Sequence, residues 1–407
     1  MQQLRINGDR LWQSLMELAR IGATPKGGVR RLTLSETDRE ARDLFARWAR
    51  EAGLEVEVDA IGNMFARRTG SDPSLPPVAM GSHLDSQPSG GKFDGAYGVM
   101  AGLEVLRTLN EAGTETRAPL EVVSWTNEEG SRFTPVMMGS GVFAGAFPLA
   151  HVLEQKDVDG TSVGDALQAI GYAGRASEHR LGAYLEAHIE QGPMLEDTKT
   201  TIGVVQGALG QRWFDAVISG QDAHAGPTPM ELRKDALIAA SRLVLEVNRI
   251  ALAFPDYARG TVGSMQVKPN SRNVVPGEVR MSVEFRNQKD ETLSAMVAAL
   301  RESLKAIETE CHVAIELTEV TYFPPCHFDA AMVGAVRDAA GALGYTQRDI
   351  VSGAGHDAVY VARVAPTAMI FVPCEGGISH NEIENATPQD LAAGCNVLLH
   401  AALTRAA

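Results

Sequence analysis

Residues 120–129, LEVVSWTNEE, run from an apolar segment straight into a polar cluster. The first six residues are mostly apolar, and a short apolar run of this kind is typical of a buried strand. Residues 126–129 follow at once. Open α/β sheets bind their ligands just beyond the carboxyl ends of the strands. The stretch therefore predicts both a buried sheet and a polar site at its edge.

Two further segments repeat this plan. Residues 77–82, PVAMGS, form an apolar run that leads directly into residues 83–85, HLD. Residues 95–110 then have apolar positions at helical spacing. Late in the chain, residues 368–372, AMIFV, lead through a glycine-rich loop to residues 379–382, SHNE. Strands that alternate with helices predict an α/β domain, here with a mixed sheet that carries its polar residues at one edge.

A different pattern occupies the stretch between residues 212 and 325. The expected elements are a strand at 213–220, a helix at 231–253, a strand at 279–285, a helix at 291–308 and a strand at 312–320. One sheet covered by two helices is a two-layer α+β arrangement. We therefore expect an α/β domain made of residues 1–211 and 326–407, with an α+β domain of residues 212–325 inserted into it.

The overall composition excludes several classes of protein. The chain has 407 residues, of which 44% are hydrophobic, and a formal net charge of −14. Nucleic acids and anionic membranes are bound through clustered Lys and Arg, so we expect neither as a partner, although a small anionic substrate stays compatible. The four cysteines lack paired metal-binding spacing, and the first 20 residues lack a signal-peptide core. No apolar run approaches the ~20 residues of a membrane helix, and we expect a cytoplasmic protein.

Five potential metal ligands occur along the chain. They are His83, Asp94, Glu129, His188 and His380. Imidazole nitrogen and carboxylate oxygen suit zinc-class ions, and two ions about 3.5–4 Å apart need a shared ligand. Asp94 is the candidate bridge, because its flanking glycines let the backbone turn tightly and bring the carboxylate close. Any one of these residues alone is more often a surface or capping residue, but placement of the set at strand ends favours a site.

Two acidic positions supplement the five. Asp85 follows His83 by two residues, so we expect its carboxylate to accept a hydrogen bond from the second ring nitrogen of a ligating His83. Glu128 and Glu129 are adjacent carboxylates that repel each other unless a cation neutralises one. One would bind metal while its neighbour serves as general base toward a metal-bound water. A solvated acidic turn, or a helix N-terminus that favours negative charge, would explain the same pair without chemistry.

Five segments together resemble one known family. They are HLD at 83–85, GGKFDG at 90–95, TNEEGSRF at 126–133, EAHIEQGP at 186–193 and ISHNE at 378–382. This ordered set is similar to the amidase branch of the dinuclear aminoacylase/carboxypeptidase superfamily. That branch holds N-carbamoyl-L-amino-acid hydrolases, β-ureidopropionases and allantoate amidohydrolases, and the resemblance covers essentially the whole chain.

The resemblance implies a role for each metal-site residue. His83 and His188 would bind one divalent ion. Glu129 and His380 would bind a second, and Asp94 would bridge the two. The ions would be zinc, manganese, cobalt or nickel, since such donors suit all four.

The resemblance also implies the chemistry. Glu128 would be the general base in hydrolysis of an N-carbamoyl amino acid to the amino acid, ammonia and carbon dioxide. Allantoate hydrolysis is one alternative, and an N-acyl amino-acid deacylase or peptidase with the same metals is another. A metal-containing binding or scaffold protein is a further reading, but such a protein would have no need of a base beside its ligands.

Residues in the insert complete the expected site. His224 lies on a loop that Gly226, Pro227 and Pro229 keep from forming a helix. The family implies a homodimer in which His224 crosses the interface and stabilises the oxyanion in the neighbouring subunit. Without the family, a stray loop histidine explains the same residue equally well.

Four residues would bind substrate. Arg286 ends an alternating strand on its polar face, where an arginine is usually a solubilising charge; the family implies a bidentate clamp on the substrate carboxylate. Gln191 and Asn270 would add hydrogen bonds to that end of the substrate. His356, in GAGHD at residues 353–357, is expected in the substrate pocket or behind the ligands, with a structural His356–Asp357 pair as the alternative.

Overall fold

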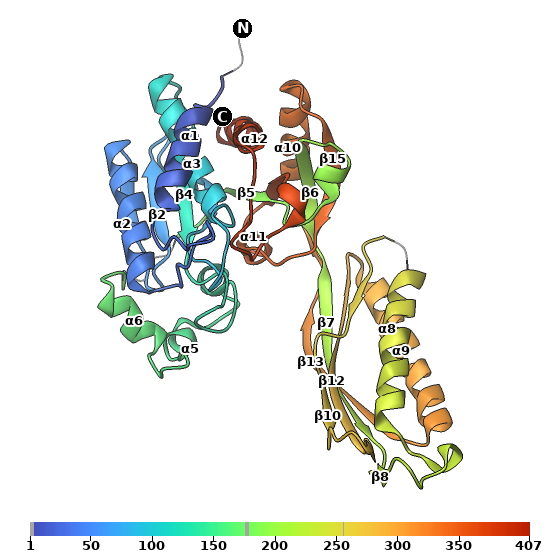
Figure 1. Cartoon of the computed structure of the whole chain (residues 1–407). Coiled ribbons are helices and arrows are strands. Elements are labelled where there is room, and N and C mark those ends of the chain that lie inside the picture. The colour runs from blue at the N-terminus through green and yellow to red at the C-terminus, as the bar shows by residue number, and fades with distance from the viewer. Residues whose placement is uncertain (1–3, 176–178, 255) are drawn as a thin grey trace. The chain divides into compact units, whose positions relative to one another are not determined.

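The computed structural model describes residues 4–175, 179–254 and 256–407. It separates into two compact units (Figure 1). The large unit comprises Met1–Gly207 and Phe328–Ala407, and the inserted unit comprises Ala208–His327. Each unit is described by itself below.

A mixed nine-stranded sheet organises the large unit and also includes the short strand β14 from the end of the inserted segment. Its strands are β1 (Glu55–Val58), β2 (Met64–Arg68), β3 (Val78–His83), β4 (Leu120–Trp125), β5 (Ala183–Ile189), β6 (Ile202–Ala208), β14 (Cys326–His327), β15 (Gln347–Ser352) and β16 (Thr367–Val372). The order is β1-β2-β4-β3-β5-β16-β6-β14, and β15 pairs with β6. The four central strands β4, β3, β5 and β16 are mutually parallel, and every residue in them is buried. The expected mixed-sheet α/β class is confirmed.

Helices pack around this sheet (Figure 1). The longer ones are α1 (Gly8–Leu18), α2 (Glu36–Glu51), α3 (Ala96–Glu111), α10 (Ala330–Ala342) and α12 (Pro388–Ala406). The shorter ones are α4 (Met138–Phe143), α5 (Leu149–Leu153), α6 (Val163–Ala169), α7 (Met194–Asp197), α11 (Asp357–Val361) and the 3-10 turn η2 (Glu375–Gly377). Helices α3 and α12 contact each other and the central strands, so the core of the unit lies between them and the sheet.

The inserted unit is a two-layer α+β structure, as expected. Its strands are β7 (Gly210–Ser219), β9 (Arg259–Thr261), β10 (Met265–Lys268), β12 (Glu278–Asn287) and β13 (Ala314–Phe323), in the order β10-β12-β7-β13 with β9 beside β12. Helices α8 (Ala236–Ala253) and α9 (Asp290–Cys311) pack on this sheet. A single apolar cluster that includes Phe214, Leu243, Phe285 and Leu300 fills the space between the layers.

One helix boundary in this unit differs from the prediction. The pattern predicts a helix from residue 231, but α8 begins at Ala236. The side chain of Asp235 caps it by accepting hydrogen bonds from the backbone N–H groups of Leu237 and Ile238, at 2.9 and 3.1 Å. The residues just before form a separate 3-10 turn, η1 (Met230–Leu232).

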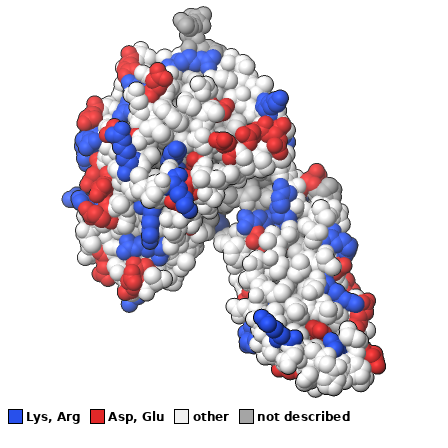
Figure 2. Space-filling view, in the orientation of Figure 1, with Lys and Arg blue, Asp and Glu red and all other residues white. Residues whose placement is uncertain are grey.

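Charges of both signs are interspersed over the visible surface of each unit (Figure 2). The visible face shows no broad basic patch of the kind that binds a polyanion. Among the described residues, no helix combines the length and apolar character needed to cross a membrane.

Candidate metal centre and active site

Four neighbouring strand ends build the site. His83 is the last residue of β3, Glu128 and Glu129 follow β4, and His188 is the penultimate residue of β5. His380 follows β16 after the η2 turn. Because these four strands are parallel neighbours, their carboxyl ends share one edge of the sheet, and the polar residues meet there.

The backbone turns sharply where these residues leave the sheet. Asn127, Gln191 and His380 have φ angles of 56°, 57° and 52°, in the left-handed region that non-glycine residues rarely adopt. Gly95 also has a positive φ, and a Cβ there would lie 2.4 Å from the His83 ring. Strained backbone of this kind clusters at functional sites, where the surrounding structure holds it in place.

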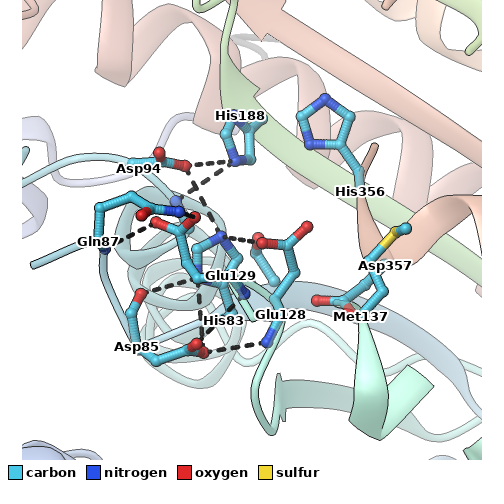
Figure 3. Close-up of polar contacts among 12 residues, drawn as sticks. His83, Asp85, Gln87, Asp94, Glu128, Glu129, Met137, His188, His356 and Asp357 are labelled. Atoms are coloured by element: carbon cyan, nitrogen blue, oxygen red, sulfur yellow. Dashed lines mark hydrogen bonds and ion pairs between the residues drawn. The ribbon is translucent and has the colours of Figure 1, made fainter. Parts of the chain in front are cut away.

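The two oxygens of Asp94 face different partners, and Figure 3 shows the link from Asp94 to His188. Oδ1 is 3.2 Å from His188 Nε2 and 3.7 Å from His83 Nε2. Oδ2 is 3.3 Å from His380 Nε2, which is itself 3.3 Å from Glu129 Oε2. Two donor groups thus share Asp94, and a third, made of Glu186, His188 and His356, adjoins the first through His188.

The two buried histidines are oriented as ligands. Nδ1 of His83 lies 2.9 Å from the main-chain oxygen of Asp85, and Nδ1 of His188 lies 2.8 Å from that of Ile189. A carbonyl oxygen can only accept, so each Nδ1 carries a proton and each Nε2 faces the cluster, where the neutral ring can bind a cation. Ligating histidines are held in the same way in metal sites.

The expected role of the Asp85 carboxylate is therefore wrong in one respect. The ring nitrogen of His83 is bonded to the main chain of Asp85, and the nearest carboxylate oxygen is 3.8 Å away. The carboxylate instead accepts the backbone N–H groups of Glu128 and Glu129, each at 3.3 Å. Asp85 thus holds two parts of the site. Its carboxylate fixes the turn that carries both glutamates, and its main-chain oxygen fixes the ring of His83.

The cluster concentrates negative charge out of water. Burial and the neighbouring Asp94 raise the pKa of Glu129 to about 7. Burial also raises the pKa of Glu128 well above its usual value. The hydrogen bond to Asp94 raises the pKa of His380 to about 9, although burial opposes this. Carboxylates this close repel each other, so the site is built to hold positive charge.

Glu128 lies beside the donor groups but belongs to none of them. Its Oε2 atom is 3.5 Å from His83 Nε2, and its side chain is 11% exposed. Figure 3 shows the carboxylate at the edge of the cluster, next to His83 and on the side of Asp357. A carboxylate in this position can exchange a proton with a molecule held at the cluster.

Comparison with known proteins agrees with this geometry. The model of peptidase family M20/M25/M40 matches residues 79–404, most of the chain. The chain belongs to this family. The M20 family is metal-dependent, and the described residues contain the candidate ligand groups.

Individual relatives match nearly the whole chain. An N-carbamoyl-L-amino-acid amidohydrolase from Rhizobium meliloti is 46% identical over 99% of this chain and 97% of its own length. An allantoate amidohydrolase from Bacillus subtilis is 34% identical over 94% and 93%. The crystal structure of an amidase of the hydantoinase/carbamoylase family from Burkholderia multivorans is 57% identical, with a TM-score of 0.97 and coverage of 99% and 98%. The chain is thus an M20-family member of the hydantoinase/carbamoylase amidase type.

Other expected residues in this M20 site have identifiable partners. Gln191 Nε2 donates to Asp94 Oδ2 at 2.9 Å and to Ser379 Oγ at 3.2 Å. His356 is buried against the His188 ring, with Nε2 2.8 Å from Ser352 Oγ. Asp357 accepts from Ser140 at 2.5 Å. His356 and Asp357 are thus both buried and hydrogen bonded, each to a different serine.

Two contributors to the site were not anticipated. Gln87 holds both oxygens of Glu129, through its backbone N–H at 3.0 Å and its side-chain amide at 2.6 Å. Glu384 accepts the backbone N–H of Asp94 at 3.1 Å. Glu384 follows His380 by four residues in the same loop, and this proximity is the signal that could have drawn attention to it.

The remaining expected residues belong to the inserted unit and are described within it alone. His224 is exposed on the short strand β8 (Ala223–His224), which pairs with β11 (Val274–Val275). Asn270 is exposed just beyond β10. Arg286 lies near the end of β12 and contacts Glu284.

Proposed function

We propose that this chain is a metal-dependent amidohydrolase that converts an N-carbamoyl-L-amino acid to the amino acid, ammonia and carbon dioxide. The observation that carries the proposal is the division of donors around Asp94, whose two oxygens face separate groups of ligands. A shared carboxylate of this kind is what a pair of ions requires. The relative from Rhizobium meliloti, named for this reaction, supports the choice of substrate.

The chain's donors fit two divalent cations of the zinc, manganese, cobalt and nickel class. His83 and His188 would hold one cation and Glu129 and His380 the other, with Asp94 between them. Two observations support this assignment. The Nε2 atoms of His83 and His188 face the cluster, and the cluster has an excess of buried carboxylates. When bound, the cations would supply Lewis acidity toward a water molecule and the substrate carbonyl.

Glu128 would act as the general base and then as the general acid. It takes a proton from the attacking water as the oxygen bonds to the ureido carbon. It returns this proton to the amino nitrogen as the carbon–nitrogen bond breaks, which leaves the free amino acid and carbamate. Carbamate then decomposes to ammonia and carbon dioxide.

Polar groups with capacity for a further bond would recognise the substrate. The Oε1 atom of Gln191 is buried and has no hydrogen-bond partner among the described residues. It can therefore accept a hydrogen bond from a substrate N–H group. The guanidinium of Arg286 would bind the substrate carboxylate, because its planar array of donors matches two carboxylate oxygens. His356 would line the pocket beside His188.

The arrangement of the inserted unit supports a homodimer. Strand β12 has ten residues, and at ~3.4 Å per residue Arg286 lies about 27 Å along it from Glu278. The last residues of β7 and β10 pair beside Glu278, and His224 and Asn270 follow those two strands. Figure 1 shows β8 beyond that same end of the sheet. One inserted unit thus cannot bring His224 and Arg286 to one small substrate, so His224 and Asn270 would come from a second copy.

Helix α8 offers a surface for that second copy. Ile238, Leu245 and Leu252 recur every seven residues on one face of the helix and are 50%, 67% and 78% exposed. An apolar stripe of this spacing is suited to packing against another helix. Its place in the same unit as His224 and Asn270 makes a second copy of this chain the expected occupant.

Ammonia release from N-carbamoyl-L-methionine, N-carbamoyl-β-alanine and allantoate tests the proposal. The full-length protein is assayed after chelation and again after reloading with manganese or zinc. We expect turnover that depends on metal and is fastest with the N-carbamoyl-L-amino acid. Preference for allantoate would assign the alternative that the Bacillus subtilis relative represents. Inactivity on all three by a metal-loaded protein would contradict the proposal and favour a deacylase or peptidase.

A further inference from the structure

Asp94 can bridge two ions only if its carboxylate is aimed accurately, yet it lies in a glycine-rich turn ahead of α3. We propose that Glu384 is the positioning residue that holds this turn in place and aligns Asp94 with His380. This inference rests on the dinuclear centre proposed above.

Direct contacts link Glu384 to the turn. Its Oε1 atom accepts the backbone N–H groups of both Phe93 and Asp94, at 3.0 and 3.1 Å. Two adjacent N–H groups bonded to one oxygen fix the orientation of the peptide planes on either side of Phe93, and so the direction in which the Asp94 side chain leaves the backbone. Glu384 is 1% exposed, so water does not compete for these bonds.

The second oxygen of Glu384 extends the link to the other ligand group. Oε2 accepts the Ser379 hydroxyl at 2.8 Å, and Ser379 precedes His380. Ser379 Oγ also lies 3.2 Å from Asp94 Oδ2, the oxygen that faces His380. One carboxylate thereby joins the loop that carries the bridge to the loop that carries His380.

The shape of the turn is matched to this carboxylate. A Cβ at Gly91 would lie 2.0 Å from the Glu384 carboxyl carbon, so the turn can pass Glu384 only with glycine at this position. The side-chain amides of Gln191 and Gln87 bond to the carboxylate oxygens of Asp94 and Glu129. Glu384 instead bonds to the backbone of Asp94, which sets the position from which the Asp94 side chain extends.

Two substitutions distinguish positioning from a purely electrostatic role. Glu384→Gln removes the charge but keeps an acceptor oxygen at the same reach, and the Ser379 hydroxyl can accept from the new amide. Glu384→Asp keeps the charge but shortens the side chain by one methylene, so it no longer reaches the Phe93 and Asp94 N–H groups. If Glu384 acts by its position, the Gln variant should lose less manganese affinity than the Asp variant. If it acts by its charge, the Asp variant should lose less.

The measurement is calorimetric titration of metal-stripped full-length protein with manganese, without substrate. We expect Glu384→Asp to bind manganese about 10–100-fold more weakly, as is typical when a partner of a metal ligand is lost, and Glu384→Gln to stay near wild type. In ammonia release at saturating manganese, we expect kcat of the Asp variant to fall while KM, which depends on other residues, changes little.

The control is Glu375→Asp, which shortens an exposed carboxylate nearby in the sequence. The Glu375 carboxylate accepts a hydrogen bond from Asn385, which is not one of the proposed metal ligands. It should bind manganese as wild type does. Wild-type affinity in Glu384→Asp, or equal loss in the Gln and Asp variants, would overturn the inference. Because manganese binding needs no turnover, such a result is distinguishable from a failure of the proposed carbamoyl hydrolysis.

Discussion

The two units of this chain present their polar residues in opposite ways. In the large unit, parallel strands end side by side and gather His83, Asp94 and His188 into a buried cluster. In the inserted unit, antiparallel strands carry Arg286 to one end of the sheet and leave His224 at the other. All five proposed metal ligands therefore lie in the large unit of one chain. The proposed recognition residues His224 and Arg286 lie at opposite ends of the inserted sheet, so we expect substrate binding to depend on assembly.

The largest effect on activity is expected from a substitution at the proposed metal centre of the large unit. Glu128→Gln removes the proton acceptor without removing a ligand, so we expect kcat to fall by about 10²–10⁴-fold. Ammonia release measures this loss, and metal content determined by mass spectrometry should remain that of the wild type. Turnover close to wild type would exclude Glu128 as the base.

If His224 and Arg286 of one site come from different copies, two inactive variants should restore activity when their subunits are mixed. His224→Ala and Arg286→Ala should each be nearly inactive alone, because every site lacks one group. If the two residues act in one site from different copies, a mixed dimer has one intact site. Random exchange of subunits should then restore about a quarter of wild-type activity, since half of the dimers are mixed and half of their sites are intact. Leu245→Glu, which charges the α8 stripe, should prevent this recovery. An inactive mixture of dimers that have exchanged subunits would contradict the shared site.

The smallest effect concerns protons at the metal centre. Without metal, hydrogen bonding to Asp94 raises the pKa of His380 to about 9, and burial raises the pKa of Glu129 to about 7. Both groups must be deprotonated to bind a cation, so metal affinity should increase as the pH rises from 6 to 9. At pH 8, titration in two buffers of different ionisation enthalpy should show net proton release, to which His380 contributes because its pKa of about 9 lies above the buffer pH. Affinity that is unchanged or falls over this range would contradict the assignment of His380 as a ligand.

Much of this architecture is predictable because parallel strands put neighbouring sequence signals at one edge. The apolar run of β4 ends at Trp125 as predicted, and the polar cluster follows it. Strand β5 was not predicted, because Glu186 and His188 interrupt its apolar pattern. Both are nevertheless buried and hydrogen bonded; Glu186 accepts from Ser82 at 2.7 Å.

Contacts between distant residues escaped prediction. Glu384 and Asp94 are 290 positions apart, and only the order of strands brings their loops together. The bond from His83 to the main chain of Asp85, rather than to its carboxylate, depends on local backbone geometry that residue spacing does not specify.

The most direct test of the account is an anomalous-scattering map from crystals of manganese-loaded protein. The account predicts two peaks about 3.5–4 Å apart on either side of the Asp94 carboxylate, one beside His83 and His188 and the other beside Glu129 and His380. A single peak in fully loaded crystals, or two peaks that do not share Asp94, would contradict it.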